Sequence, residues 1–148
     1  MRLEIRAIGK MRAPLAEIFA EYHKRIGKEL TVTEYEAPKG LTGATLRKKE
    51  TTFLLADLPP GPVVALDEHG RDQDSEALAR LFARWREAGG VVFLIGGADG
   101  LADEVRARAD LLLSLGRKTW PHLLARVLLA EQIYRARQIL AAHPYHRS

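Results

Sequence analysis

The chain has 148 residues, of which 47% are hydrophobic and 28% charged, and its formal net charge is +4. These values are typical of one folded domain and exclude a disordered chain. The sequence contains no cysteine, which excludes disulfides, thiolate metal ligands and cysteine nucleophiles. No apolar run is long enough to span a bilayer, and the N-terminal stretch lacks the features of a signal peptide. We therefore expect one cytoplasmic domain over residues 1–148.

Strands and helices are predicted to alternate along the chain. Alternating or continuous apolar runs predict strands at about 3–8, 30–35, 63–66, 91–95 and 111–115. Apolar residues at helical spacing, with capping residues and glycine or proline stops, predict helices at about 15–26, 44–58, 75–87, 102–109 and 121–142. This alternation favours an α/β fold with a mostly parallel sheet and helices on both faces.

The last predicted helix is apolar on several sides. At 100° per residue, Leu123, Leu128 and Leu129 point in three different directions. A domain of this size has few elements to cover all of them. We therefore expect a second copy of the chain to cover one face of this helix.

Positive charge is concentrated near the C-terminus, where residues 117–148 hold six basic residues and one acidic residue. This asymmetry suggests a polyanionic partner, although a solvated helix face would give the same pattern. We expect phosphate contacts from a set of basic residues, namely Arg117, Lys118, Arg126, Arg137 and Arg147, with Lys10 and Arg12 beside the end of the first strand.

Three predicted strands end in sequences suited to ligand binding. Leu66 opens the sequence L-D-E-H-G, Ile95 precedes G-G-A-D-G, and Leu115 opens L-G-R-K-T-W. Because the carboxyl ends of neighbouring parallel strands meet at one edge of a sheet, these loops are expected to form one pocket. The G-G-A-D-G stretch matches neither the dinucleotide fingerprint nor the phosphate loop, which disfavours a nicotinamide dehydrogenase. A tight turn with glycine at positive φ is the alternative explanation for it.

Longer motifs carry a resemblance to a known family. The segments F-L-I-G-G-A-D-G-L, L-S-L-G-R-K-T-W-P-H-L-L-A-R-V-L-L-A-E-Q-I-Y-R-A and H-P-Y-H-R together resemble the ribosomal RNA large subunit methyltransferase H family. This family is a small single-domain branch of the SPOUT methyltransferases, and the resemblance covers the whole chain. It implies a C-terminal trefoil knot and a homodimer, with the cofactor bound in the knot near the subunit interface.

The resemblance also implies a reaction. It indicates methyl transfer from S-adenosylmethionine to N3 of a pseudouridine in 23S rRNA. The target lies in the stem-loop that faces the small subunit, and the substrate is the assembled 70S ribosome. Two alternatives stay open, a non-catalytic ribosome-binding factor of the same fold and a SPOUT methyltransferase that acts on tRNA.

Carried over by position, the cofactor contacts come from all three strand ends, namely Leu66, Gly96, Leu115, Gly116, Arg117, Lys118, Thr119 and Trp120. The apolar side chains would line a slot for adenine, and the glycines would let the ligand approach the backbone. This chain is more basic than its relatives at Arg117 and Lys118, so an RNA contact is an alternative for both. Near the pocket, Asp67, Glu68 and Asp99 could balance the sulfonium charge, although Asp99 could instead cap the next helix.

The resemblance places the catalytic residues in the tail, at His143, Tyr145, His146 and Arg147. An unperturbed histidine pKa of about 6.5 suits removal of the N3 proton near neutral pH. A frayed chain end is the alternative explanation. We expect His122 to be a helix-start residue with a local hydrogen bond. The histidines show no ligand spacing, so no metal site is expected.

Overall fold

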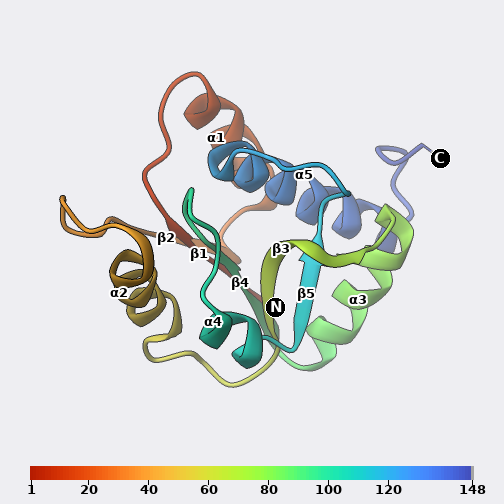
Figure 1. The fold of residues 1–148 in the computed structure, drawn as a ribbon. Helices are drawn as coiled ribbons and strands as arrows, with labels where there is room; N and C mark the ends of the chain where they lie inside the picture. Colours follow the sequence, from red (N-terminus) through yellow and green to blue (C-terminus); the bar gives the residue numbers. More distant parts are fainter. Residues whose placement is uncertain (148) are drawn as a thin grey trace.

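The computed structural model describes residues 1–147 and contains one five-stranded parallel sheet in the order β2-β1-β4-β3-β5. The strands are β1 (Arg2–Ile8), β2 (Leu30–Tyr35), β3 (Val63–Asp72), β4 (Gly90–Ile95) and β5 (Leu111–Ser114). The sheet confirms the α/β fold, and Figure 1 shows its arrangement. The trefoil knot stays a prediction.

Helices cover both faces of the sheet (Figure 1). One layer consists of α1 (Leu15–Ile26), α3 (Ser75–Glu87) and α5 (His122–Leu140), and the other of α2 (Gly43–Leu55) and α4 (Asp103–Arg108). In β4, Val91 and Phe93 pack into the first layer, whereas Val92 and Leu94 pack into the second. Burial on both faces explains why this central strand is continuously apolar. Within residues 1–147 no helix has the length and apolar character to cross a membrane.

The second helix ends earlier than predicted, at Leu55 instead of residue 58. The buried Arg6 of β1 donates to the carbonyl of Leu54 at 3.1 Å and to that of Ala56, and so satisfies carbonyls that a helix end leaves free. Asp57 then takes a φ of 47°, which turns the chain out of the helix. The end of α2 is therefore set by a side chain about fifty residues earlier in the sequence.

The third strand extends to Asp72, beyond the predicted end at residue 66. Leu66 and Arg71 both pair with Leu113, so the residues between them bulge out of the ladder. Glycine is required at position 70, because a Cβ there would lie 2.5 Å from the carbonyl oxygen of Leu112. The bulge directs residues 67–69 into the wall of a pocket.

Two of the arginines predicted to contact phosphate bind other groups of the chain instead, Arg126 in the interior and Arg137 at the surface. Arg126 has an exposed fraction of 0%, donates to the carbonyls of Ile8 at 3.3 Å and Gly9 at 2.9 Å, and pairs with Glu34. The prediction for Arg126 is therefore wrong, because this stripe of α5 faces the end of β1 and not solvent. Arg137 donates to the carbonyl of Ile26 and to Glu29, both at 2.9 Å.

Candidate functional site

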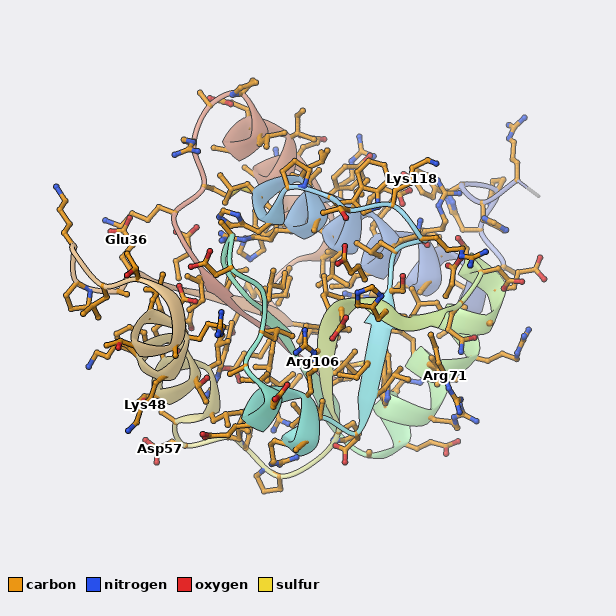
Figure 2. All side chains as sticks on the ribbon, viewed as in Figure 1. Glu36, Lys48, Asp57, Arg71, Arg106 and Lys118 are labelled. Carbon is orange, nitrogen blue, oxygen red and sulfur yellow. The ribbon has the colours of Figure 1, made fainter. Side chains whose placement is uncertain are left out.

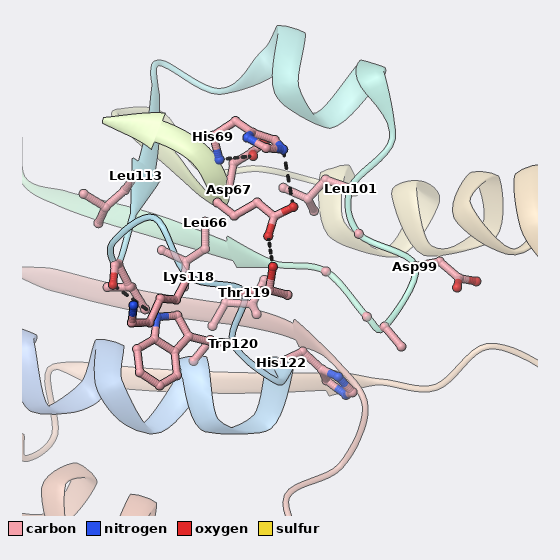
Figure 3. Close-up of a pocket in the computed structure, with 18 of the residues that line it drawn as sticks. Leu66, Asp67, His69, Asp99, Leu101, Leu113, Lys118, Thr119, Trp120 and His122 are labelled. Carbon is pink, nitrogen blue, oxygen red and sulfur yellow. Dashed lines mark hydrogen bonds and ion pairs between the residues drawn. The ribbon is translucent and has the colours of Figure 1, made fainter. Parts of the chain in front are cut away.

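The three strand ends converge on one cavity of about 350 Å³ at the carboxyl edge of the sheet (Figure 3). Its lining includes seven of the eight residues assigned to the cofactor, namely Leu66, Gly96, Leu115, Gly116, Lys118, Thr119 and Trp120. Arg117 is the exception, because it is exposed and does not line the cavity. The structure thus brings together segments about fifty residues apart in the sequence, while their contact with a cofactor stays a prediction.

The glycine-rich loop uses its glycines in different ways. Gly100 has a φ of 77° and donates its N–H to the carbonyl of Gly97 at 3.0 Å, which closes a tight turn. Gly96 is required for packing, since a Cβ there would lie 2.9 Å from Leu101 Cδ2 and 3.0 Å from the carbonyl oxygen of Gly100. Asp99 does not cap α4, whose N-cap is Ala102, and in Figure 3 it points outward from the loop. The turn explanation therefore holds for Gly100 but not for Gly96.

The loop after β5 is closed by its own hydrogen bonds. The indole N–H of Trp120 donates to the carbonyl of Leu115 at 3.1 Å, and the hydroxyl of Thr119 donates to Glu68 at 2.6 Å. Gly116 turns the chain at a φ of 110° and donates its N–H to Ser114 Oγ at 3.1 Å. These contacts hold Thr119 and Trp120 in the wall of the pocket (Figure 3).

The acidic residues of the pocket differ in their environments. Burial raises the pKa of Asp67, but hydrogen bonds from Arg106 and the backbone N–H of His69 outweigh it and lower that pKa overall. The charge of Asp67 is therefore neutralised within the protein. Glu68 and Asp99 are exposed and stay available to a cationic ligand, although Glu68 also holds Thr119.

His122 lines the cavity, which the sequence analysis did not anticipate. Its imidazole forms no hydrogen bond within residues 1–147, so the prediction of a local hydrogen bond is wrong. Burial, followed by the positive charges of Arg126 and Arg12, lowers the pKa of His122. It is thus a neutral imidazole at physiological pH and a candidate proton acceptor. The sequence did contain one indication that His122 belongs to the pocket, because it follows directly after the loop that lines the pocket, at the start of the last helix.

The four tail residues do not line the pocket of their own chain. The Tyr145 hydroxyl donates to Glu131 at 3.1 Å, and His146 Nδ1 lies 3.1 Å from Arg135 Nη1. Burial, with hydrogen bonds to Tyr22 and Glu131, raises the pKa of Tyr145, so its hydroxyl keeps its proton. The tail therefore packs along α5, which does not fit a frayed end, and its catalytic role stays a prediction.

Beneath the glycine loop lies a buried carboxyl that the sequence analysis missed. Glu50 of α2 has an exposed fraction of 6%, and its Oε1 is buried without a hydrogen-bond partner among the described residues. A Cβ on Gly97 would lie 3.1 Å from Glu50 Oε2, so the side chain lies directly against the loop. Burial, with the negative charge of Asp99, raises the pKa of Glu50.

We expect Glu50→Gln to become more stable relative to wild type as pH rises. Because the folded pKa of Glu50 is above its unfolded value, ionisation costs the wild type stability as pH rises from the unfolded pKa through the folded one. The relative gain between pH 4 and pH 7.5 should be on the order of 1 kcal/mol, the size of a buried unsatisfied polar group. Urea unfolding over this pH range measures it. The exposed Glu104→Gln is the control, and a pH-independent difference at position 50 would contradict the prediction.

A parallel α/β sheet with a glycine loop and a pocket at its carboxyl edge defines a small-molecule-binding α/β domain. The model of the predicted SPOUT methyltransferase family matches residues 1–146. The chain is 54% identical to a protein of Rhodospirillum centenum over the full length of both, and 52% identical to one of Paramagnetospirillum magneticum over 99% of each. Both relatives are named ribosomal RNA large subunit methyltransferase H. The chain therefore belongs to the SPOUT methyltransferases and, among them, to the ribosomal RNA large subunit methyltransferase H family.

Solved structures agree with the fold. A probable methylase family protein from Haemophilus influenzae Rd KW20 superposes with a TM-score of 0.57 at 12% identity, covering 99% of this chain and 70% of that one. The SpoU methyltransferase AviRb from Streptomyces viridochromogenes, in complex with AdoMet, gives 0.52 at 13% identity and covers 95% and 58%. At these identities the likeness concerns the fold alone.

Proposed function

We propose that this protein methylates 23S rRNA, transferring a methyl group from S-adenosylmethionine to N3 of a pseudouridine in assembled ribosomes. The observation that carries the proposal is the convergence of seven family-assigned residues on one cavity. The names of the full-length relatives support methylation of large-subunit rRNA. The choice of N3 and of the 70S ribosome comes from the family resemblance. A cytoplasmic location follows from that substrate.

The cavity fits the cofactor in size and chemistry. About 350 Å³ lies within the range of small-molecule sites. Leu66, Leu115 and Trp120 would hold the adenine, and Glu68 with Asp99 would face the sulfonium charge. When bound, S-adenosylmethionine supplies the methyl group. Gly116 would admit it close to the backbone, because a Cβ there has open space around it and would stand in the ligand's way. Gly96 would act indirectly, by letting the loop pack against Leu101 and Gly100.

The protein must position the nucleotide and accept its N3 proton. In the tail, the imidazole of His143 or His146, or a water bound there, would take the proton. Arg147 would stabilise negative charge on the neighbouring carbonyls. Tyr145 keeps its proton and would act as a donor. The tail would thus provide the substrate half of the active site.

None of these tail residues lines its own pocket, so we propose that a homodimer joins the tail of one protomer to the pocket of its partner. Two apolar side chains at opposite ends of α5 support the dimer, since Trp120 before the helix and Leu140 at its end are each 38% exposed. A partner packed along α5 would cover both. This arrangement would also place the cofactor near the subunit interface.

The experiment is methyl transfer from labelled S-adenosylmethionine to ribosomes lacking the modification, to free large subunits and to bulk tRNA, with the product nucleoside identified by mass. We expect N3-methylpseudouridine in whole ribosomes. Label in tRNA would overturn the target, and a wild-type chain that does not bind the cofactor would favour a non-catalytic factor.

Gly96→Ala serves as the control with impaired cofactor binding, because the added Cβ would collide with Leu101 and Gly100 and distort the loop. It should lower cofactor affinity at least tenfold, or about 1.4 kcal/mol.

A further inference from the structure

Helix α2 and the loop before it carry four cations, Arg47 half-buried and the other three exposed, that the proposed function has not used. We call Lys39, Arg47, Lys48 and Lys49 the basic α2 surface. Residues 37–56 contain one acid, Glu50, and it is buried. No member of the basic α2 surface forms an ion pair with any residue of the described chain. Figure 2 shows Lys48 extending from the outer side of α2.

The helix does not need these charges for its own stability. Four residues after Arg47, Lys48 and Lys49 stand two threonines and a phenylalanine, so no acid forms an i,i+4 pair with them. Lys49 Nζ lies 5.1 Å from the centre of the Phe53 ring, a contact that leaves its charge unneutralised. The cations also stand in the middle of α2, and its last turn, where the helix dipole would favour them, has none. Their charge is therefore available to an external anion.

The basic α2 surface continues into the pocket region. A groove of about 550 Å³ lies between α2 and α4, with Arg47 and Lys48 on its α2 side. Asp99, Leu101 and Arg106 line both this groove and the cofactor pocket, so the two hollows adjoin across the glycine loop. The opposite side of the groove is acidic.

That side carries Asp103 and Glu104 of α4. Arg106 of α4 also lines it, but its charge is paired with Asp67 and Asp103. An anionic strand that leaves the pocket through the groove would therefore run along the α2 side. The α5 arginines expected to serve this purpose already have partners within the chain, because Arg126 and Arg137 each bind a carboxylate and at least one backbone carbonyl. Among residues 1–147, the basic α2 surface is therefore one unpaired group of cations next to the pocket, and Arg117 and Lys118 of the loop after β5 are another.

We propose that the basic α2 surface binds backbone phosphates of the RNA substrate on one side of the target nucleotide. The inference rests on the proposed function and adds the place where the RNA backbone lies. Each phosphate neutralised by Lys or Arg releases counterions, so the binding constant should fall steeply with salt.

The test compares two variants with equal charge loss. Arg47→Gln/Lys48→Gln/Lys49→Gln neutralises α2, and Arg80→Gln/Arg84→Gln/Arg86→Gln neutralises three exposed, unpaired cations of α3 on the opposite face of the sheet. Gln is a good helix former, so both helices should persist. Binding to ribosomes lacking the modification, KM and kcat for methylation, and S-adenosylmethionine affinity are measured between about 50 and 300 mM salt, the range over which phosphate contacts dominate.

We expect the α2 variant to raise KM at least tenfold near 150 mM salt, with kcat and cofactor affinity unchanged. The slope of log K against log[salt] should become shallower by about 2 for three lost contacts. The α3 variant should behave as wild type, and Arg47→Lys/Lys48→Arg/Lys49→Arg should restore binding. If the α2 variant and the α3 variant have the same KM and the same salt dependence of ribosome binding, this inference is overturned and the proposed function is not affected. A wild-type chain that binds cofactor but neither binds nor methylates ribosomes would overturn the proposed function as well.

Discussion

Replacing both tail histidines, as His143→Ala/His146→Ala, is expected to lower kcat for methyl transfer by about 10²- to 10⁴-fold, the usual contribution of general base catalysis. Cofactor affinity should stay unchanged, because the tail is proposed to contact the nucleotide, whereas the strand-end loops would hold the cofactor. Single-turnover methylation of ribosomes and calorimetric titration with S-adenosylmethionine separate the two quantities. An unchanged kcat would show that the tail histidines take no part in proton transfer, and His122 would then be the remaining candidate base.

Mixing two impaired variants, at a cofactor concentration too low for Gly96→Ala to bind it, tests whether the site is shared between protomers. A dimer of one His143→Ala/His146→Ala chain and one Gly96→Ala chain would hold one intact site, if the tail acts on the partner's pocket. Random exchange makes half of the dimers mixed, so about a quarter of wild-type activity should return. No recovery, with mixed dimers demonstrated by mass spectrometry, would show that tail and pocket act within one chain.

Arg126→Met is expected to lower the free energy of unfolding by about 3–5 kcal/mol, the usual cost of breaking a buried charged network. The variant leaves the carbonyls of Ile8 and Gly9 without a donor in the interior of the fold. Glu34 contributes less to this cost, because its side chain is 32% exposed and water can reach it. Urea unfolding at one fixed protein concentration measures the change, since a dimer couples stability to concentration.

Arg137→Met is the matched control on the same helix. Its guanidinium also binds a carbonyl and a carboxylate, but the side chain is 33% exposed, so a loss of about 1 kcal/mol is expected. Equal losses in the two variants would contradict the view that burial of Arg126 decides how much it contributes to stability.

Because the charge of Arg126 also helps to lower the pKa of His122, the Arg126→Met variant should move that pKa back toward its ordinary value.

The sequence by itself determined the layers of the fold and the edge where the pocket lies. Residues 91–95 are continuously apolar because β4 is covered on both faces, and this pattern can be read without any partner. The three loop sequences after Leu66, Ile95 and Leu115 were predictable as neighbours, because the carboxyl ends of parallel strands share one edge. Local pattern and chain direction are sufficient for these features.

Only the tertiary structure decided which charges are free. Arg126 and Arg137 lie on one polar stripe of α5, yet both are bound by other parts of the chain, and Arg126 pairs with Glu34 from 92 positions away. Among the described residues the cations of α2 have no such partner, and Lys48 and Lys49 stay exposed. The same holds for Glu50, whose burial depends on Gly97 of a distant loop. Helical periodicity indicates which residues share a face, but a charge is buried or free according to what the rest of the chain packs against that face.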